Sequence, residues 1–182
     1  MNNSSKLSEI MRIPSILAVT KISHEMEAGI EILDCIFPYD QNAKIRKLKF
    51  PGLVIVESIL NGMEIVELLN RSECFLSQVK RVIPISIITK TEVKVIVNVV
   101  TDLSKSFSKN ERTFKVELKE YGGRRFGNYI VDMIAKILKE EMRWVVKLRD
   151  PEIMICLYIF DDETIISVVE RDMIWENKFL LK

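Results

Sequence analysis

The order in which apolar periodicity changes along the first 84 residues limits the fold more than any other feature of this sequence. Residues 13–20 form an apolar run typical of a buried strand, and the next apolar residues recur at helical spacing. Ser23 is placed to cap this helix and Pro38 to end it. We expect the buried stripe of the helix to consist of Met26, Ile30, Leu33 and Phe37.

A hairpin, a second helix and a further strand follow. Residues 44–50 and 53–58 are predicted to pair around a Pro-Gly turn. Asn61 can cap a helix over residues 62–71, and VKRVIPISI, which begins at residue 79, predicts a strand. The order strand, helix, strand, strand, helix, strand is that of a ferredoxin-like fold. In such a unit both helices cover one face of an antiparallel sheet and leave the other face free.

The segment from residue 91 to 107 carries conflicting signals. β-Branched residues dominate TEVKVIVNVV and favour a strand, whereas the apolar residues recur at helical spacing as far as Phe107. The length of the segment favours a helix, and Thr91 can cap its start with Glu92 in the first turn. We therefore predict a helix.

From residue 112 onward the sequence predicts a strand, a glycine turn, a helix and a hairpin. Residues 113–119 alternate apolar and charged side chains, as in a half-exposed strand. The turn YGGRR precedes an amphipathic helix. Two apolar strands follow, 153–160 and 164–169, joined by three acidic residues. One helix pair packed on a sheet is the expected core of this half.

The basic residues are concentrated in the middle of the chain, although the formal net charge is only +1. Residues 1–104 hold 12 Lys and Arg against 12 Asp and Glu, residues 105–149 hold 12 against 6, and residues 150–182 hold 3 against 8. A basic segment in an otherwise neutral protein fits a face that meets phosphate. A solvated lysine-rich face would give the same pattern.

The turn from Tyr121 to Arg125 is the place where the sequence predicts ligand chemistry. Its two glycines let another backbone approach closely, and the start of the following helix offers unpaired N–H groups and the positive end of the helix dipole. Arg124 and Arg125 add planar guanidinium groups suited to phosphate oxygens. An ordinary strand-to-helix turn with solvated arginines is the simpler alternative.

No metal-binding or catalytic motif accompanies this turn. Cys35, Cys74 and Cys156 are far apart and His24 is the only histidine, so no set of metal ligands has recognisable spacing. Apolar neighbours around each cysteine favour buried, reduced thiols in a cytoplasmic protein. The N-terminus lacks the apolar region of a secretory signal, and no apolar run is long enough to cross a membrane. We expect no cofactor, no metal and no membrane partner.

Two segments taken together resemble a known family. TFKVELKEYGGRRFGNYIVDMIAKIL followed by VVKLRDPEIMICLYIFDDETIISVV is similar to a THUMP domain, a tRNA-binding module attached to several tRNA-modifying enzymes. The sharpest motif is the spacing of Val146, Leu148 and Pro151, and the upstream order matches the small ferredoxin-like domain that precedes the THUMP domain in that family. Departures from the family pattern include Arg124, Arg125, Phe126, Gly127 and Lys147.

The resemblance implies an α+β protein of two domains. A ferredoxin-like domain would occupy residues 1–84, and a THUMP domain, with helices packed on a mixed sheet, would occupy residues 85–182. The second domain would end in an acidic C-terminal tail whose apolar residues pack back on that domain or contact a partner subunit.

The resemblance also implies a function. We expect no catalytic domain after the last strand. The resemblance is therefore to THUMP-only proteins that are similar to adaptors for tRNA N4-acetylcytidine formation. In those systems a separate acetyltransferase performs the chemistry. We expect a cytoplasmic, non-catalytic adaptor that presents tRNA, through its acceptor end, to that enzyme, and no DNA partner. The residues expected to contact RNA are Lys115, Lys119, Arg124, Arg125, Asn128 and Lys147, with Tyr121 or Tyr129 stacking on a base and Lys80 and Arg81 extending the surface.

Two other functions remain open from the sequence. The protein could be a scaffold that binds another protein through its sheet face or C-terminal tail, with the basic segment merely solvated. It could also be a small enzyme, provided that a pocket gathered Asp132 and a carboxylate of the tail.

Overall fold

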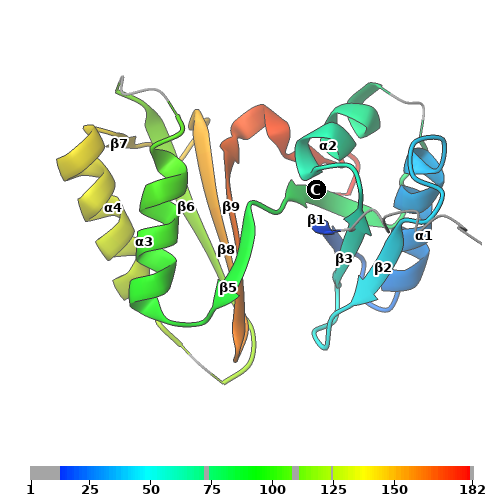
Figure 1. Cartoon of the computed structure of the whole chain (residues 1–182), viewed down its shortest axis with the longest axis horizontal. Helices are drawn as coiled ribbons and strands as arrows, with labels where there is room; N and C mark the ends of the chain where they lie inside the picture. Colours follow the sequence, from blue (N-terminus) through cyan, green and yellow to red (C-terminus); the bar gives the residue numbers. More distant parts are fainter. Residues whose placement is uncertain (1–12, 72–73, 108–110, 124, 181–182) are drawn as a thin grey trace, which may run out of the picture.

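The computed structural model describes residues 13–71, 74–107, 111–123 and 125–180. Within this part of the chain, two five-stranded sheets and four α-helices form four layers. Figure 1 shows the sheets facing each other in the middle of the molecule, with α1 and α2 outside one sheet and α3 and α4 outside the other. The protein is therefore of the α+β class, as predicted.

The first sheet has the strand order β10-β4-β1-β3-β2, and all its pairings are antiparallel. Strands β1 to β4 and the two helices form the ferredoxin-like arrangement predicted from the sequence. The elements are β1 (Ile13–Thr20), α1 (Glu25–Ile36), β2 (Lys44–Lys47), β3 (Leu53–Ser58), α2 (Gly62–Arg71), β4 (Val79–Pro84) and β10 (Trp175–Glu176).

The second sheet has the order β5-β9-β8-β6-β7. It is mixed, as expected, because β6 runs parallel to β7 and β8 while β5 and β8 are antiparallel to β9. The helix predicted in the conflicting segment is confirmed as α3 (Val93–Ser104). The other elements are β5 (Ile87–Lys90), β6 (Thr113–Glu120), α4 (Asn128–Met142), β7 (Val145–Val146), β8 (Ile153–Ile159), β9 (Glu163–Glu170) and the 3₁₀ helix η1 (Arg171–Met173).

One of the three predicted helix caps is confirmed. The Oδ1 atom of Asn61 accepts two amides of the first turn of α2, each at 3.0 Å. The predictions for Ser23 and Thr91 are wrong, because the cap positions of α1 and α3 are taken by His24 and Glu92, one residue further along the chain. Neither of these two cap residues makes a side-chain capping bond.

The buried face of α1 differs from the predicted stripe. The apolar and small residues buried on this helix are Ala28, Gly29, Ile32 and Ile36. Met26, Ile30 and Phe37 are instead 43%, 50% and 55% exposed. Gly29 lies so close to Ile45 of β2 that an added Cβ would be 2.7 Å from the Ile45 side chain. The helix therefore packs with its small residues against the sheet, and apolar spacing alone pointed to the wrong face.

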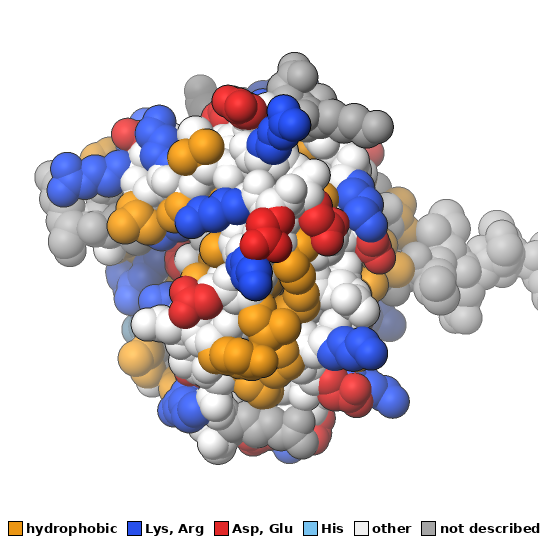
Figure 2. Space-filling model, turned by 90° about the vertical axis from the view of Figure 1, so that its left-hand side faces the viewer, with side chains coloured by type: hydrophobic (Ala, Val, Ile, Leu, Met, Phe, Trp, Pro, Cys, Tyr) orange, Lys and Arg blue, Asp and Glu red, His pale blue; other side chains and the backbone are white. Residues whose placement is uncertain are grey.

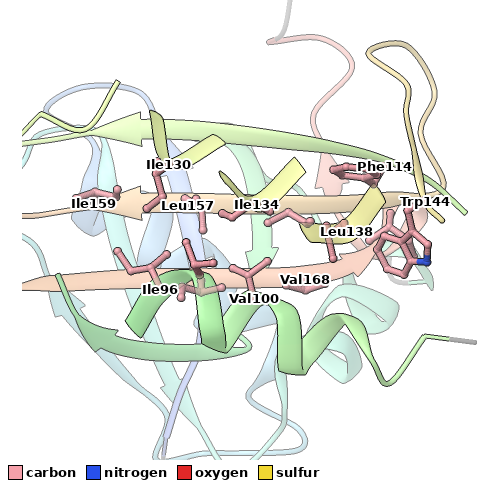
Figure 3. Packing of buried hydrophobic residues seen from close by; sticks show 14 residues of the cluster. Ile96, Val100, Phe114, Ile130, Ile134, Leu138, Trp144, Leu157, Ile159 and Val168 are labelled. Carbon is pink, nitrogen blue, oxygen red and sulfur yellow. The ribbon is translucent and has the colours of Figure 1, made fainter. Parts of the chain in front are cut away.

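The helices of the second half cover a continuous apolar core. Side chains of α3 and α4 meet those of β8 and β9 in Figure 3, and Phe114 and Trp144 close one end of the cluster. The ten labelled residues of the figure are each at most 5% exposed: Ile96, Val100, Phe114, Ile130, Ile134, Leu138, Trp144, Leu157, Ile159 and Val168. This burial explains why α3 is a helix despite its β-branched residues, since packing overrides intrinsic propensity.

The faces of the two sheets that carry no helix pack against each other. The cluster between them includes Leu17, Leu53, Ile55 and Ile83 from the first sheet and Met154, Cys156, Tyr158, Phe160 and Ile165 from the second. The expectation that the first sheet leaves one face free is therefore wrong, because that face is apolar and the second sheet covers it. A scaffold that binds partners through this sheet face is excluded by the same contact.

The strand predicted to begin at residue 79 is divided between the two sheets. β4 ends at Pro84, and β5 begins at Ile87 in the other sheet. In between, the Ser86 amide donates to the Ile166 carbonyl of β9 at 3.0 Å. The chain thus passes from one sheet to the other within two residues, while the predicted division into domains at residue 84 stays a prediction.

The C-terminal tail packs on the first sheet. Trp175 and Glu176 of β10 pair with Val82 and Arg81 of β4, and Ile174 is buried between the sheets. The prediction that the tail packs on the second domain holds for Ile174, which contacts both sheets, and is wrong for Trp175, which packs on the first sheet; contact with a partner subunit stays a prediction. The tail crosses from one sheet to the other.

Two of the three cysteines are joined. Cys35 at the end of α1 and Cys74 after α2 form a disulfide with a Cα–Cα distance of 5.9 Å. The prediction of reduced thiols is wrong for this pair, because the fold brings together two residues that are 39 positions apart. Cys156 is free and buried between the sheets, and burial raises the pKa of its thiol to about 12.

Candidate nucleic-acid interface

The candidate residues of this protein are cationic and aromatic. Among the residues that the structure describes, no three His, Cys, Asp or Glu side chains gather closely enough to hold a metal ion. None of the described helices combines the length and the apolar character needed to cross a membrane.

Strand β6 carries two predicted RNA contacts on one face. Its apolar residues point into the helical core, so the alternating lysines Lys115 and Lys119 lie on the face turned toward the first sheet. Lys115 is half-buried and Lys119 is exposed. Lys147, which follows β7, is exposed beside the start of β6, because its amide donates to the Phe114 carbonyl at 2.9 Å.

Arg125 lies at the other end of β6. Its Nη1 atom donates to the carbonyl of Glu120 at 2.8 Å, and its side chain is otherwise exposed. A strand rises about 3.3 Å per residue, so Lys147 beside Phe114 and Arg125 beside Glu120 are separated by roughly 20 Å. The four cations Lys115, Lys119, Arg125 and Lys147 therefore form a line along one strand, which we call the β6 track.

The glycine turn between β6 and α4 does not offer a free anion site. The Gly123 amide donates to Asp161 Oδ1 at 2.8 Å, and the Phe126 and Gly127 amides donate to Glu120 Oε1 at 2.5 and 3.2 Å. The prediction that this turn cradles a phosphate is therefore wrong, since these amides already have carboxylate acceptors. Arg124, the other arginine of the prediction, lies outside the described residues.

The two predicted stacking residues have different surroundings. Tyr121 is half-buried, and its ring centroid lies 5.4 Å from those of Phe50 and Phe160 and 6.3 Å from that of Tyr158. Burial raises the pKa of the Tyr121 hydroxyl. The Tyr121 ring therefore packs in the contact between the sheets. Tyr129 at the start of α4 is instead 63% exposed, and Asn128 before it is also exposed.

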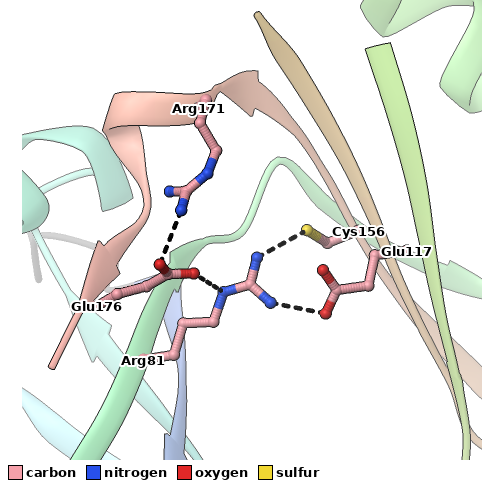
Figure 4. A network of polar contacts seen from close by, with 5 residues as sticks. All are labelled: Arg81, Glu117, Cys156, Arg171 and Glu176. Carbon is pink, nitrogen blue, oxygen red and sulfur yellow. Dashed lines mark hydrogen bonds and ion pairs between the residues drawn. The ribbon is translucent and has the colours of Figure 1, made fainter. Parts of the chain in front are cut away.

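Arg81 is buried in a network of ions between the sheets (Figure 4). Its guanidinium lies 2.6 Å from Glu117 of β6 and 3.3 Å from Glu176 of β10, and only 12% of its side chain is exposed. Glu176 also binds Arg171 at 2.8 Å. Arg81 thus joins both sheets and the tail and is not available to a phosphate, contrary to the prediction. Lys80 on the same strand remains half-buried at the surface.

The outer face formed by α3 and α4 mixes both signs of charge. Figure 2 shows Lys and Arg interspersed with Asp and Glu around a band of apolar side chains on this face. On α4, the exposed Lys136 and Lys139 lie close in sequence to Asp132, Glu140 and Glu141. The β6 track, on the other side of the sheet, is therefore the better candidate for an anionic polymer.

The first half of the chain has a basic run over residues 44–49 that was not predicted to bind a ligand. Arg46 is held by Glu57 at 3.2 Å and Glu163 at 3.8 Å, whereas Lys47 and Lys49 are exposed. A pocket of about 400 Å³ separates this segment from the turn between β8 and β9. The run escaped notice because the charges of residues 1–104 cancel, and a count over a short window would have revealed it.

The fold and the basic strand belong to an α+β protein whose second half matches a known domain. Residues 90–169 match the model of the THUMP domain. The chain therefore contains a THUMP domain, which spans α3 to β9. No curated relative matches the sequence.

Several solved structures share the fold. PH1313 from Pyrococcus horikoshii Ot3 is 13% identical with a TM-score of 0.63, over 88% of this chain and 55% of that chain. TrmN from Thermus thermophilus is 14% identical with a TM-score of 0.60, over 84% and 44%. A 4-thiouridine synthetase in complex with RNA and bound ATP is 17% identical with a TM-score of 0.55, over 91% and 42%.

These comparisons overturn the prediction that the protein is not an enzyme. The fold recurs in longer proteins that include a synthetase and a possible methylase from Clostridium difficile 630. The present chain spans about half the length of these proteins or less. The prediction rested on the lack of a catalytic motif and of a catalytic domain after the last strand, and neither feature separates this chain from such enzymes.

Proposed function

We propose that this protein binds tRNA through the β6 track and serves a tRNA-modification reaction. The observation that supports this most directly is the coincidence of the track with the THUMP domain at residues 90–169. A solved structure with the same fold is a synthetase in complex with RNA. The sequence resemblance covers the same stretch of the chain and implies the same ligand.

The arrangement of the cations suits a nucleic-acid backbone. Four cationic side chains along about 20 Å of one strand can meet successive phosphates, whereas a compact cluster would suit a single anion. Glu117 lies among them, but its carboxylate is bound to Arg81 at 2.6 Å. Such contacts position RNA by charge and shape without reading its sequence.

The reaction that the bound tRNA undergoes is a separate and more specific proposal. We propose that the bound tRNA is presented, through its acceptor end, to a catalytic centre in the cytoplasm, and that the modification is N4-acetylation of cytidine by an acetyltransferase. This specific chemistry is supported by the sequence resemblance alone. Loss of N4-acetylcytidine from tRNA of cells that lack this protein supports it, and loss of a different tRNA modification contradicts it while leaving tRNA binding intact.

Replacing Lys115, Lys119 and Lys147 together by alanine tests tRNA binding. We expect a weaker affinity for tRNA and a salt slope lower by roughly 2 to 3, because each lost phosphate contact removes most of one released counterion. Fluorescence anisotropy with labelled tRNA over a range of salt concentrations measures both quantities. Lys136→Ala with Lys139→Ala on α4 is the matched control and leaves both unchanged; the same affinity and slope for the triple variant contradict the proposal.

A further inference from the structure

Two phenylalanine rings are almost completely exposed in the segments next to β4 and β10 of the first sheet. Phe75 is 85% and Phe179 is 89% exposed, the highest values among the exposed large hydrophobic side chains of the described residues. Bare aromatic rings are unfavourable in water, so two of them need an explanation.

The backbone on both sides of Phe75 is anchored. Cys74 is tied to α1 by its disulfide, and Leu76 is only 5% exposed. The carboxylate of Glu31 accepts the Ser77 hydroxyl at 2.5 Å and the Gln78 amide at 3.0 Å. Phe75 is therefore held with its ring in solvent by neighbours that are themselves fixed.

Asn177 attaches the tail to this loop and places Phe179 beside it. Its side-chain amide donates to the carbonyls of Leu76 at 2.8 Å and Val79 at 3.2 Å. Its Oδ1 atom accepts the Phe179 amide at 3.0 Å. Since Leu76 follows Phe75 in the chain, Asn177 brings the segments that carry the two exposed rings together.

The two segments that carry the rings contain two lysines, and the carboxylate of Glu31, which binds Ser77 and Gln78, lies beside them. Residues 74–80 and 177–180 contain Lys80 and Lys178 and no acidic residue. Arg81 holds both Glu117 of β6 and Glu176 of β10, and Lys119 and Lys178 each lie two residues beyond these carboxylates. Arg81 thus connects the start of the tail to β6, and Lys80 and Lys178 are the cations of the two segments that carry the rings.

We propose that Phe75 and Phe179 are stacking platforms for unpaired nucleotides of the bound RNA, with Lys80 and Lys178 against neighbouring phosphates. Aromatic rings interleaved with cations are typical of surfaces that bind single-stranded nucleic acid. A protein-docking surface would be a continuous apolar patch, whereas the polar side chain of Asn177 lies between the segments that carry these rings. The inference rests on the proposed function. It adds that this part of the surface binds unpaired RNA rather than duplex RNA.

The test compares two labelled RNA hairpins, one with a blunt end and one with a short unpaired 3′ extension, on the full chain. We expect the native protein to prefer the extended hairpin. Phe75→Ala and Phe179→Ala should each weaken binding of the extended hairpin about 5-fold or more, because stacking on one ring has that order of effect, and leave the blunt hairpin unchanged. Phe179→Trp, which keeps a stacking ring, should retain the preference.

Met63→Ala is the control, because Met63 is also an exposed apolar side chain, at 49%, but lies at the start of α2, the end of that helix opposite to the loop with Phe75. It should bind both hairpins as the native protein does. If the native protein binds neither RNA, the proposed function fails. If the native protein binds both hairpins and the alanine variants keep its preference for the extension, only the stacking inference is overturned, and the rings then serve a protein contact.

Discussion

Gly122 determines the geometry of the turn that follows β6. Its φ is +90°, a conformation that L side chains rarely adopt, and an added Cβ would lie 2.4 Å from Asp161 Oδ1. That same oxygen accepts the Gly123 amide at 2.8 Å. The glycine is thus required for the contact between this turn and the hairpin of β8 and β9, rather than for a phosphate.

Gly122→Ala should lower the free energy of unfolding by about 1–3 kcal/mol, because the backbone strain adds to the displacement of Asp161. Urea unfolding followed by circular dichroism measures it. Gly123→Ala is the control, since its φ is not positive and the nearest heavy atom to an added Cβ is 3.8 Å away. An equal loss of unfolding free energy in the two variants would show that Gly122 is no more constrained than Gly123.

At the scale of single elements, α1 shows what periodicity leaves open. The helix has apolar residues on two neighbouring faces, and the face with Ala28 and Gly29 is the buried one because small side chains let the helix lie close to β2. A disulfide from its last turn to Cys74 then ties α1 to the loop after α2. The position of Phe75 depends on this connection.

Cys35→Ser should lower the free energy of unfolding by roughly 2–4 kcal/mol, because the disulfide closes a loop of 39 residues in the unfolded chain. Thermal unfolding with and without a reducing agent checks the cause. The reductant should destabilise the native protein and have no effect on the Cys35→Ser variant. A native protein that is insensitive to reductant would mean that the bond does not contribute to stability.

At the scale of the whole molecule, Arg81 connects the parts that the sequence presents as separate. The first sheet supplies the arginine, the second sheet supplies Glu117, and the tail supplies Glu176 (Figure 4). The apolar faces of the two sheets meet around this network. Folding of the two halves is therefore expected to be cooperative.

Arg81→Met should lower the free energy of unfolding by about 2–4 kcal/mol, since it leaves Glu117 without its cation in a largely buried site and removes one of the two arginines that bind Glu176. Arg71→Met is the control, because its ion pair with Glu67 on α2 is exposed and contributes about 1 kcal/mol or less. The affinity for tRNA should equal that of the native protein in the folded double variant Arg81→Met with Glu117→Gln, which removes the arginine without leaving an uncompensated carboxylate in the β6 track. A loss of tRNA affinity in this folded double variant would restore Arg81 as an RNA contact.

The sequence was a good guide to elements and a poor guide to the site. Asn61 capped its helix as predicted, and α3 was identified against its propensity, because both signals are local. Lys115 and Lys119 were assigned to one face of β6 by simple alternation. Arg81 and Tyr121 could not be judged in the same way, because their partners, such as Glu176 and Phe50, are distant in sequence.

The sequence by itself determined the order of helices and strands, the ferredoxin-like and THUMP-type halves, and the concentration of positive charge between residues 105 and 149. Periodicity, caps and charge counts act over a few residues, so they can be read without the fold. Only the tertiary structure decided that the sheets face each other, that Asp161 fills the glycine turn, and that Asn177 joins the tail to the loop that carries Phe75. These are contacts between residues tens of positions apart, and they depend on which apolar faces become buried together.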